Sequence, residues 1–404
     1  MIPRKRIDIG VRELAQGLMY CCLPGDGARE RAQIEARWDR RPSLACLSVR
    51  SGFDALLAAL ALPPGAEVLM SAVNIADMVR IVEAHGLVAV PVDVDMRRLE
   101  VTAAQLARAA TPRTRAVLIA HLFGSRMPMQ DIVAFCRKNN YVLIEDAAQA
   151  YTGDAWRGTP EADASLFSFG PVKPSTVLGG AVLGFRDAAL CERVRGHMGR
   201  WPLQPFADYA QRLIKYAGLA PFGNRWVFGA LATLCRWCGT THDGLVAGVA
   251  RGFTRGEFYR LIRQQPSAPL LRLLRRRIAQ GVSAGTELRA RNSRRLQALL
   301  GDCCIGSAAA QHAHWLFPIT HVDPEGLVRR LVARGFDATQ QASTLAVIQP
   351  PPGAAPAAEA ARAFAQLVYL PAHEGMNVAE VERMAAAVAA FVPRFRSAAR
   401  PSPA

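Results

Sequence analysis

Long apolar runs are missing from this chain of 404 residues, even though 51% of the residues are hydrophobic. No run reaches the roughly 20 residues that a membrane-crossing helix needs. Aromatic residues are sparse, at 7%, and the nine cysteines have no regular spacing, which argues against a disulfide framework. The segment after Arg4-Lys5-Arg6 contains Asp8, Arg12 and Glu13, so it lacks the apolar centre of a signal peptide. These absences predict a cytoplasmic protein with reduced cysteines.

Lysine is scarce too, and the basic charge is unevenly placed. The chain has only four lysines, Lys5, Lys138, Lys173 and Lys215, and arginine carries the remaining positive charge. Residues 191–300 hold nineteen basic residues against five acids, which accounts for nearly all of the net charge of +16. Because zinc-finger spacing and aromatic RNA-binding motifs are absent, the sequence predicts no nucleic-acid partner. Cys235-Arg-Trp-Cys238 has the spacing of a metal or redox pair but lacks two further ligands, so we expect no metal site.

Short apolar runs alternate with helical patterns through the first half of the chain. Strands are predicted over 67–70, 88–92, 115–120, 141–145, 164–167 and 181–185. Helices are predicted over 75–85, 103–110, 129–139 and 187–195. This alternation is typical of an α/β protein with a mostly parallel sheet and covering helices.

The remaining segments suggest the domain organisation. Residues 1–40 are polar and basic without a clear period and are expected to be an arm. Residues 41–280 would form the large domain, beginning with a helix from Gly52 to Leu62 behind Ser51 as N-cap and including a divergent basic and apolar segment, 195–280. Residues 281–404 would form a smaller α+β domain, with a strand over 315–320 and helices over 323–335 and 377–391.

Lys173 stands between two strand-like runs, in Phe167-Ser-Phe-Gly-Pro-Val-Lys173 before Leu178-Gly-Gly-Ala-Val-Leu-Gly-Phe185. Upstream, the run Val142-Leu-Ile-Glu-Asp146 is followed by Gln149. A lysine amine is the side chain that forms a Schiff base with an aldehyde cofactor. An aspartate at the end of a strand provides the counter-ion that a pyridinium nitrogen needs. The pair therefore indicates chemistry on a pyridine aldehyde.

Several ordered motifs carry a resemblance to a known family. They are Ser51-Gly-Phe-Asp-Ala-Leu56, Pro91-Val-Asp-Val-Asp95, Thr111-Pro-Arg-Thr114, His121-Leu-Phe-Gly124, Glu145 to Gln149, Phe167 to Phe169, Lys173, Gly179-Gly180 and Tyr369-Leu-Pro-Ala-His373. With these motifs the chain resembles the DegT/DnrJ/EryC1/StrS family of pyridoxal-phosphate (PLP) enzymes, mostly sugar aminotransferases. The resemblance implies a fold-type-I PLP aminotransferase-like protein with a mostly parallel, seven-stranded sheet, covering helices and a smaller C-terminal α+β domain.

The resemblance also implies roles for individual residues. Lys173 would carry PLP and act as general base, and Asp146 would face the ring nitrogen. Gln149 would lie near the phenolic oxygen or cover the ring. Backbone N–H groups of Ser51, Gly52 and Phe53 and the hydroxyl of Ser168 would hold the phosphate, and Asn224 would reach the phosphate of the partner subunit in a homodimer. His121 and His373 are expected to be packed structural residues.

Two departures from the family pattern bear on function. Phe53 replaces the usual threonine, and the stretch Ser71 to Asp77 lacks the aromatic residue that stacks on the PLP ring, so that Asn74 or Ile75 could fill that space. A PLP-fold protein that has lost catalysis and acts by binding therefore stays open as an alternative.

The resemblance implies transfer of an amino group from an amino acid, with glutamate as the expected donor, to a keto sugar in nucleotide-linked form. Lys173 argues against the family's dehydratases, in which a histidine replaces the lysine. An alternative is amination of a non-sugar ketone, such as a cyclitol or another secondary metabolite. For the basic segment 191–300 three interpretations stay open: a solvated face that covers the dimer interface, attraction of a diphosphate-bearing substrate, and peripheral contact with an anionic membrane.

Overall fold

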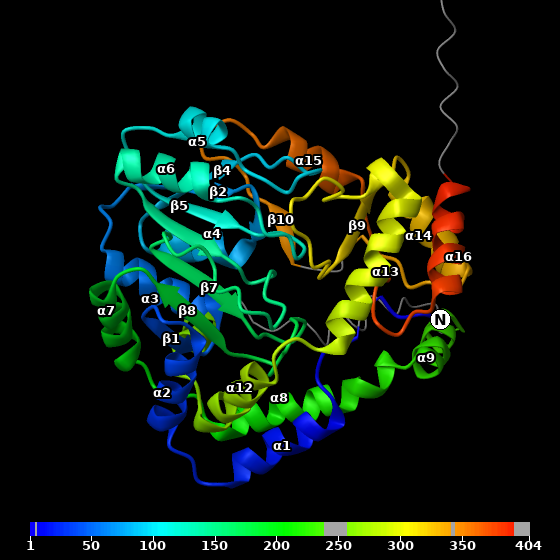
Figure 1. Ribbon diagram of the computed structural model, residues 1–404, viewed down its shortest axis with the longest axis horizontal. Coiled ribbons are helices and arrows are strands. Elements are labelled where there is room, and N and C mark those ends of the chain that lie inside the picture. Colours follow the sequence, from blue (N-terminus) through cyan, green and yellow to red (C-terminus); the bar gives the residue numbers. More distant parts are fainter. Residues whose placement is uncertain (5, 238–256, 341–343, 392–404) are drawn as a thin grey trace, which may run out of the picture.

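The computed structural model describes residues 1–4, 6–237, 257–340 and 344–391. Its largest feature is a seven-stranded sheet in the order β1-β8-β7-β6-β5-β2-β4 (Figure 1). The strands are β1 (Ser43–Cys46), β2 (Glu67–Ser71), β4 (Val88–Val92), β5 (Thr114–Ala120), β6 (Val142–Asp146), β7 (Ala164–Ser168) and β8 (Ala181–Phe185). All run in the same direction except β8, which is antiparallel to both β1 and β7. The predicted mostly parallel sheet is confirmed, and the six predicted strands agree with the observed ones to within one residue at each end.

Both faces of the sheet are covered, which explains why its strands are continuous apolar runs. Along β5, Leu118 faces one core, whereas Val117 and Ile119 face the other. The first core lies under α3 (Val49–Leu60), α4 (Ala76–Ala84) and α7 (Ala188–Gly199). The second lies under α5 (Ala103–Ala109) and α6 (Gln130–Asn139).

The N-terminal segment, expected to be an arm, contains two helices, α1 (Val11–Cys22) and α2 (Gly27–Trp38). They pack with α8 (Phe206–Leu219) and α12 (Ala268–Gln280) around a third core that includes Trp38 and Tyr209 (Figure 1). The sequence did not indicate α2 because this helix buries only Ile34 and Trp38, too few apolar positions to show a period.

The helix after β1 begins earlier than predicted. Its N-cap is Ser48, not Ser51, and the Ser48 hydroxyl oxygen accepts a hydrogen bond from the Ser51 N–H at 3.1 Å. Ser51, Gly52 and Phe53 therefore lie inside the first turns of α3. Both serines suit an N-cap, and the sequence alone favoured the wrong one because Ser51 starts the family-like motif.

Several arginines of the basic segment have acidic partners elsewhere in the chain. The segment contains α8, η1 (Ala220–Gly223), α9 (Arg225–Trp237), α11 (Phe258–Ile262) and α12. Its ion pairs to distant acids are Arg195–Glu35, Arg225–Glu380, Arg263–Asp54, Arg275–Glu30, Arg277–Asp8 and Arg295–Glu382. Part of the local excess charge thus neutralises Asp8 and acids on α2, α3 and α16 (Val378–Ala389).

The C-terminal part builds a smaller unit beside the sheet (Figure 1). Its elements are α13 (Ala284–Leu300), η2 (Gly301–Cys303), β9 (Phe317–Thr320), α14 (Pro324–Ala333), β11 (Leu367–Leu370) and α16 (Val378–Ala389). β9 and β11 form an antiparallel pair, and the helices pack around a fourth core. Two elements that lie between α14 and β11 in the chain belong to the large domain instead. β10 (Leu345–Val347) pairs with β3 (Val73–Ile75), and α15 (Ala358–Ala365) packs into the core of the large sheet. In the described ranges no helix combines the length and the apolar character of a membrane span.

Candidate active site

The carboxyl ends of the central parallel strands bring the predicted site residues to one edge of the sheet. Asp146 is the last residue of β6, Ser168 is the last residue of β7, and His121 directly follows β5. Lys173 lies in the loop that leaves β7 and returns to β8. Ligand sites of open parallel sheets lie at this edge, so the topology itself gathers the residues that the motifs singled out.

The loop that carries Lys173 is held on both sides of the lysine. The Lys173 N–H donates to the Gly170 carbonyl at 3.0 Å, and the Thr176 hydroxyl donates to the same carbonyl at 2.6 Å. On the other side, the Tyr209 hydroxyl donates to the Val177 carbonyl at 2.9 Å. These bonds fix the backbone around Lys173, so the position of its amine depends mainly on the side-chain torsions.

The amine of Lys173 lies in an environment that disfavours its charge. Burial lowers the pKa of Lys173 to about 7, Asp146 opposes this shift, and Arg50 adds to it. The Nζ atom lies 3.8 Å from the ring centroid of Trp315, whose indole N–H donates to the Val172 carbonyl at 2.8 Å. Near neutral pH a large fraction of the amine is therefore unprotonated, the form that attacks a carbonyl carbon.

Asp146 is buried, and the described residues donate to only one of its two carboxylate oxygens. Its Oδ1 accepts from the Ala148 N–H at 3.0 Å, its single side-chain hydrogen bond among the described residues. Burial raises the pKa of Asp146, opposed first by that hydrogen bond and then by the positive charges of Lys173 and Arg50. A cationic N–H donor placed beside the free oxygen would compensate the burial.

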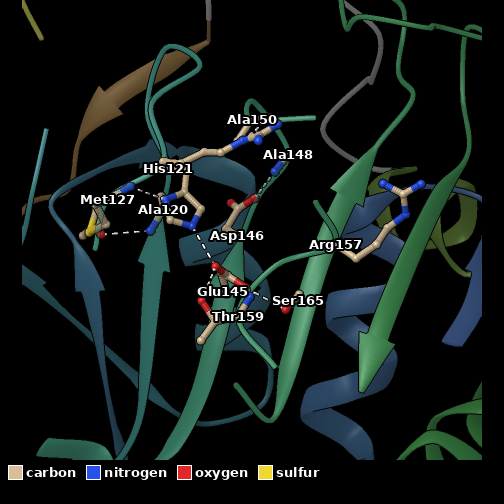
Figure 2. A network of polar contacts seen from close by, with 12 residues as sticks. Ala120, His121, Met127, Glu145, Asp146, Ala148, Ala150, Arg157, Thr159 and Ser165 are labelled. Atoms are coloured by element: carbon tan, nitrogen blue, oxygen red, sulfur yellow. Dashed lines mark hydrogen bonds and ion pairs between the residues drawn. The ribbon is translucent and has the colours of Figure 1, made fainter. Parts of the chain in front are cut away.

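A buried network supports the strand end that carries Asp146 (Figure 2). Glu145 Oε1 lies 2.9 Å from His121 Nε2, and Oε2 accepts from the Thr159 N–H and the Ser165 hydroxyl, both at 2.7 Å. Because His121 Nδ1 accepts from the Met127 N–H, the ring proton lies on Nε2 and points to Glu145. Burial would raise the pKa of Glu145, but the hydrogen bonds outweigh it and lower that pKa. His121 is thus a packed structural residue.

Gln149 holds the loop that follows β5. Its Oε1 accepts from the Phe123 N–H at 2.9 Å, a contact that fixes a residue with positive φ. With the carbonyl end engaged, its amide N–H groups are the donors that could face a ligand.

The groups predicted to hold the phosphate differ in whether they are already hydrogen-bonded within the protein. The Gly52 N–H donates to the Ser48 carbonyl at 3.0 Å, and the Ser51 N–H donates to the Ser48 hydroxyl. The Phe53 side chain is completely buried in the core between α3 and the sheet. The Ser168 hydroxyl is half-buried and accepts from the Gly170 N–H at 3.3 Å.

Two residues near Lys173 escaped the sequence reasoning. Arg50, in the first turn of α3, influences the pKa of both Lys173 and Asp146 and donates to Asp77 at 2.5 Å. Arg50 directly precedes the motif that begins at Ser51, and this position could have indicated that it lies near the site. Trp315 gave no such signal, because it comes from a segment far along the chain that packs beside Lys173 only in the fold.

Asn74 and Asn224, two other predicted residues, have local polar contacts of their own. Asn74 is buried in β3, its Oδ1 accepts from the Ile75 N–H at 2.8 Å, and its Nδ2 has no partner among the described residues. Asn224 is exposed and its Oδ1 accepts from the Trp226 N–H at the start of α9. The predicted contact of Asn224 with a partner subunit stays a prediction. Within the described residues no cluster of His, Cys, Asp or Glu suits a metal ion, and Cys238 lies outside them.

Comparisons with known proteins agree with this geometry. Residues 40–217 match the model of the DegT/DnrJ/EryC1/StrS aminotransferase family. A GDP-perosamine synthase of Caulobacter vibrioides is 31% identical over 156 residues, which are 38% of this chain and 42% of that relative. The match thus spans less than half of the relative's length.

Solved structures extend the likeness to the whole chain at the level of fold. The aminotransferase TlmJ from Streptoalloteichus hindustanus is 21% identical, with a TM-score of 0.68 over 97% of this chain and 100% of that one. NtdA from Bacillus subtilis, solved with bound cofactor PMP, is 17% identical, with a TM-score of 0.68 over 95% of this chain and 82% of that one.

The matched region, 40–217, contains Ser51, Asp146, Gln149, Ser168 and Lys173. The family resemblance and the fold-type-I architecture predicted from the sequence are confirmed. The matched region thus resembles a PLP-dependent aminotransferase family, and PLP is the cofactor that this resemblance implies.

Proposed function

We propose that this protein transfers an amino group from an amino acid to a keto sugar, using PLP held at Lys173 and Asp146. The observation that carries the proposal is the coupling of these two residues: an amine with a pKa lowered to about 7 interacts with a buried carboxylate at the carboxyl edge of the sheet. Strongly perturbed titratable groups at such an edge favour a catalytic role over a purely structural one.

The residues present fit the cofactor. When bound, PLP supplies an aldehyde that condenses with amines and a pyridinium ring that accepts electrons. Lys173 offers the unprotonated amine and, once displaced, a base of suitable pKa for moving a proton at the substrate carbon. Asp146 has a carboxylate oxygen that no described residue engages and that could accept from the ring N–H. Arg50 and Ser168 offer a cation and a hydroxyl for the phosphate.

Glutamate is the proposed donor and a nucleotide-linked keto sugar the proposed acceptor. The name of the Caulobacter relative, GDP-perosamine synthase, refers to a nucleotide-linked amino sugar and supports this class of substrate. Amination of a cyclitol or another non-sugar ketone is the alternative, because nothing in the site excludes a smaller ketone. The catalytically lapsed alternative loses support from the missing aromatic residue, since Trp315 places an aromatic ring beside Lys173. Its other reason stands, because the buried Phe53 supplies no hydroxyl.

A homodimer is part of the proposal. The outer face of α9 carries Trp226, Leu234 and Trp237, which are 79%, 56% and 83% exposed. Their spacing puts them on one side of the helix, whereas Phe228, Ala232 and Cys235 are buried on the other. An apolar stripe of this kind supports contact with a second subunit, which would also bring Asn224 near the partner. A cytoplasmic location stays a prediction.

Covalent labelling tests the proposal. The purified protein should absorb visible light, and borohydride reduction followed by peptide mapping should place a pyridoxyl group on Lys173. A Lys215→Met variant, which removes an exposed lysine, should keep both the colour and the label. The proposal is wrong if the label is found on Lys138 or Lys215, or if no label forms while the protein is folded.

A further inference from the structure

A strap at the N-terminus, residues 2–4 and 6–8, connects the C-terminal unit to the loop that carries Lys173. Three side chains of the strap line the pocket on the open side of the lysine, so the strap lies close to the amine. Trp315 forms part of the same wall and contacts the amine. The charged residues that line this pocket together with Lys173 are Arg4, Arg6, Asp8, Arg289 and Glu374.

The start of the strap is fixed to the C-terminal unit. The Ile2 N–H donates to the Gly335 carbonyl at 2.7 Å, and the Ile2 carbonyl accepts from the Asp337 N–H at 2.9 Å. The Ile2 side chain is buried in the fourth core. Arg4 donates to Asp337 Oδ2 twice, from its backbone N–H at 3.0 Å and from Nε at 2.9 Å. These contacts prevent the strap from sliding along the pocket.

The end of the strap is fixed to the lysine loop through Asp8. The Asp8 Oδ2 atom accepts from the Ser175 N–H at 2.5 Å, two residues after Lys173. From the other side, Arg277 of α12 donates to the Asp8 carbonyl at 2.7 Å, and its guanidinium lies 3.5 Å from Asp8 Oδ1. The direction of the carboxylate is therefore set both by a helix of the large domain and by the loop.

Ser175 occupies a backbone conformation that needs support. It is buried and its φ is 54°, in the left-handed region that a residue with a Cβ atom adopts at a cost. A hydrogen bond to a carboxylate is charge-assisted and therefore stronger than one to a neutral carbonyl. The bonds to the Gly170 and Val177 carbonyls hold the loop before and after this turn. Asp8 thus holds the turn that directly follows Lys173.

We propose that Asp8 is a positioning residue for Lys173, which keeps the lysine amine in its buried place in the site. This inference rests on the proposed function. There the amine acts first as a nucleophile and then as a base, so it must reach two places on the ligand. A misplacement of about 1 Å can lower a rate about 100-fold. A backbone that is held on both sides of the lysine limits where its long side chain can place the amine.

The titration of the lysine amines in protein freed of cofactor tests this role. Competitive labelling with acetic anhydride over a pH series, read by mass spectrometry, gives the pKa of each amine. Asp8→Ala leaves the turn without its acceptor, so water should reach the amine and the pKa of Lys173 should rise from about 7 to about 8. The unprotonated fraction at pH 7 then falls about fivefold. Loss of the negative charge alone would act in the opposite direction, because a carboxylate favours a charged amine.

Asp8→Asn separates the two effects. Its amide oxygen can still accept from the Ser175 N–H, so the pKa of Lys173 should stay at the parent value or fall slightly. Glu13→Ala is the matched control, because Glu13 also accepts from a backbone N–H of the N-terminal segment, that of Gly10 at 3.0 Å, but does not line the pocket. This control should leave the titration unchanged.

An unchanged or lowered pKa of Lys173 in Asp8→Ala, in protein with the circular dichroism of the parent, would overturn the positioning role. A rise of equal size in Asp8→Asn or in Glu13→Ala would also overturn it, because neither variant removes the acceptor of the Ser175 N–H. Asp8→Ser, whose side chain is too short to reach Ser175, takes the place of Asp8→Ala if the alanine variant does not fold. The titration needs no cofactor, so a parent protein that takes up no cofactor at Lys173 would refute the proposed function separately.

Discussion

Replacing Lys173 should stabilise the cofactor-free protein at neutral pH. Burial lowers the pKa of Lys173 from 10.5 to about 7 in the folded state. Between these values the unfolded chain binds more protons at this site than the folded chain, so stability rises with pH across this window. The penalty is fully present below pH 7 and is lost towards pH 10.5. Lys173→Met removes the amine and with it the penalty.

The magnitude follows from the size of the shift. One pKa unit corresponds to about 1.4 kcal/mol, so the full shift would correspond to nearly 5 kcal/mol. Because Lys173 is only half-buried and water screens part of the effect, we expect about 2 kcal/mol at pH 7. The two proteins should converge as the pH approaches 10.

Urea unfolding at pH 7, 8, 9 and 10, on protein freed of cofactor with hydroxylamine, measures this difference through the midpoint concentration. Lys215→Met is the control, because Lys215 is exposed and its removal should leave the pH dependence of the parent unchanged. Parallel stability curves for the parent and Lys173→Met would refute the reasoning, because they would mean that the folded state does not disfavour the charged amine.

Three further changes test other parts of the site. Asp146→Asn should retain the fold and some cofactor but lower turnover about 10²- to 10³-fold; a rate within a few-fold of the parent would remove Asp146 from the chemistry. Glu145→Gln should lower the free energy of unfolding by about 3 kcal/mol, because it places an amide N–H group among the donors that Glu145 accepts from; urea unfolding would show the change. Trp226→Ser combined with Trp237→Ser should shift the protein towards monomer in sedimentation velocity, and an unchanged dimer would place the interface elsewhere.

Much of the large sheet could be predicted from the sequence, because its strands are buried on both faces and read as short apolar runs. The runs at 88–92 and 181–185 match β4 and β8 residue for residue. Elements with fewer buried positions escaped notice. β3 and β10 have only three residues each, and their pairing joins segments about 270 residues apart, which no local pattern reveals.

The site residues also fall into two groups, those that local sequence patterns predict and those that only tertiary packing brings together. Lys173 and Asp146 were predicted from their chemistry beside strand-like runs, and Ser168 from the family resemblance. They meet in space because consecutive parallel strands end at one edge of the sheet. Arg289 and Trp315 come from the C-terminal part and reach Lys173 only through tertiary packing. The residue type of Arg289 carries no signal, since arginine is common throughout this chain, and no local pattern links Trp315 to Lys173. The wall of the pocket that would contact a substrate is therefore the part that the sequence reveals least.

The basic segment 191–300 allows one more prediction, concerning membranes. Each basic residue near an anionic surface contributes about 1 kcal/mol only if its charge is available. Here Arg225, Arg263 and Arg275 are paired with acids on other elements, so they add little net charge to the surface. We therefore expect no salt-sensitive sedimentation with vesicles that contain phosphatidylserine.

The exposed tryptophans of α9 provide the internal comparison for that experiment. If Trp226 and Trp237 entered a bilayer on their own, the protein would sediment with neutral and anionic vesicles alike, and added salt would not release it. Binding to anionic vesicles alone that is lost at high salt would contradict the prediction, because it would show that the segment presents enough unneutralised positive charge to hold the protein on the surface. Absence of binding at low salt would leave the subunit interface as the remaining role for the α9 face.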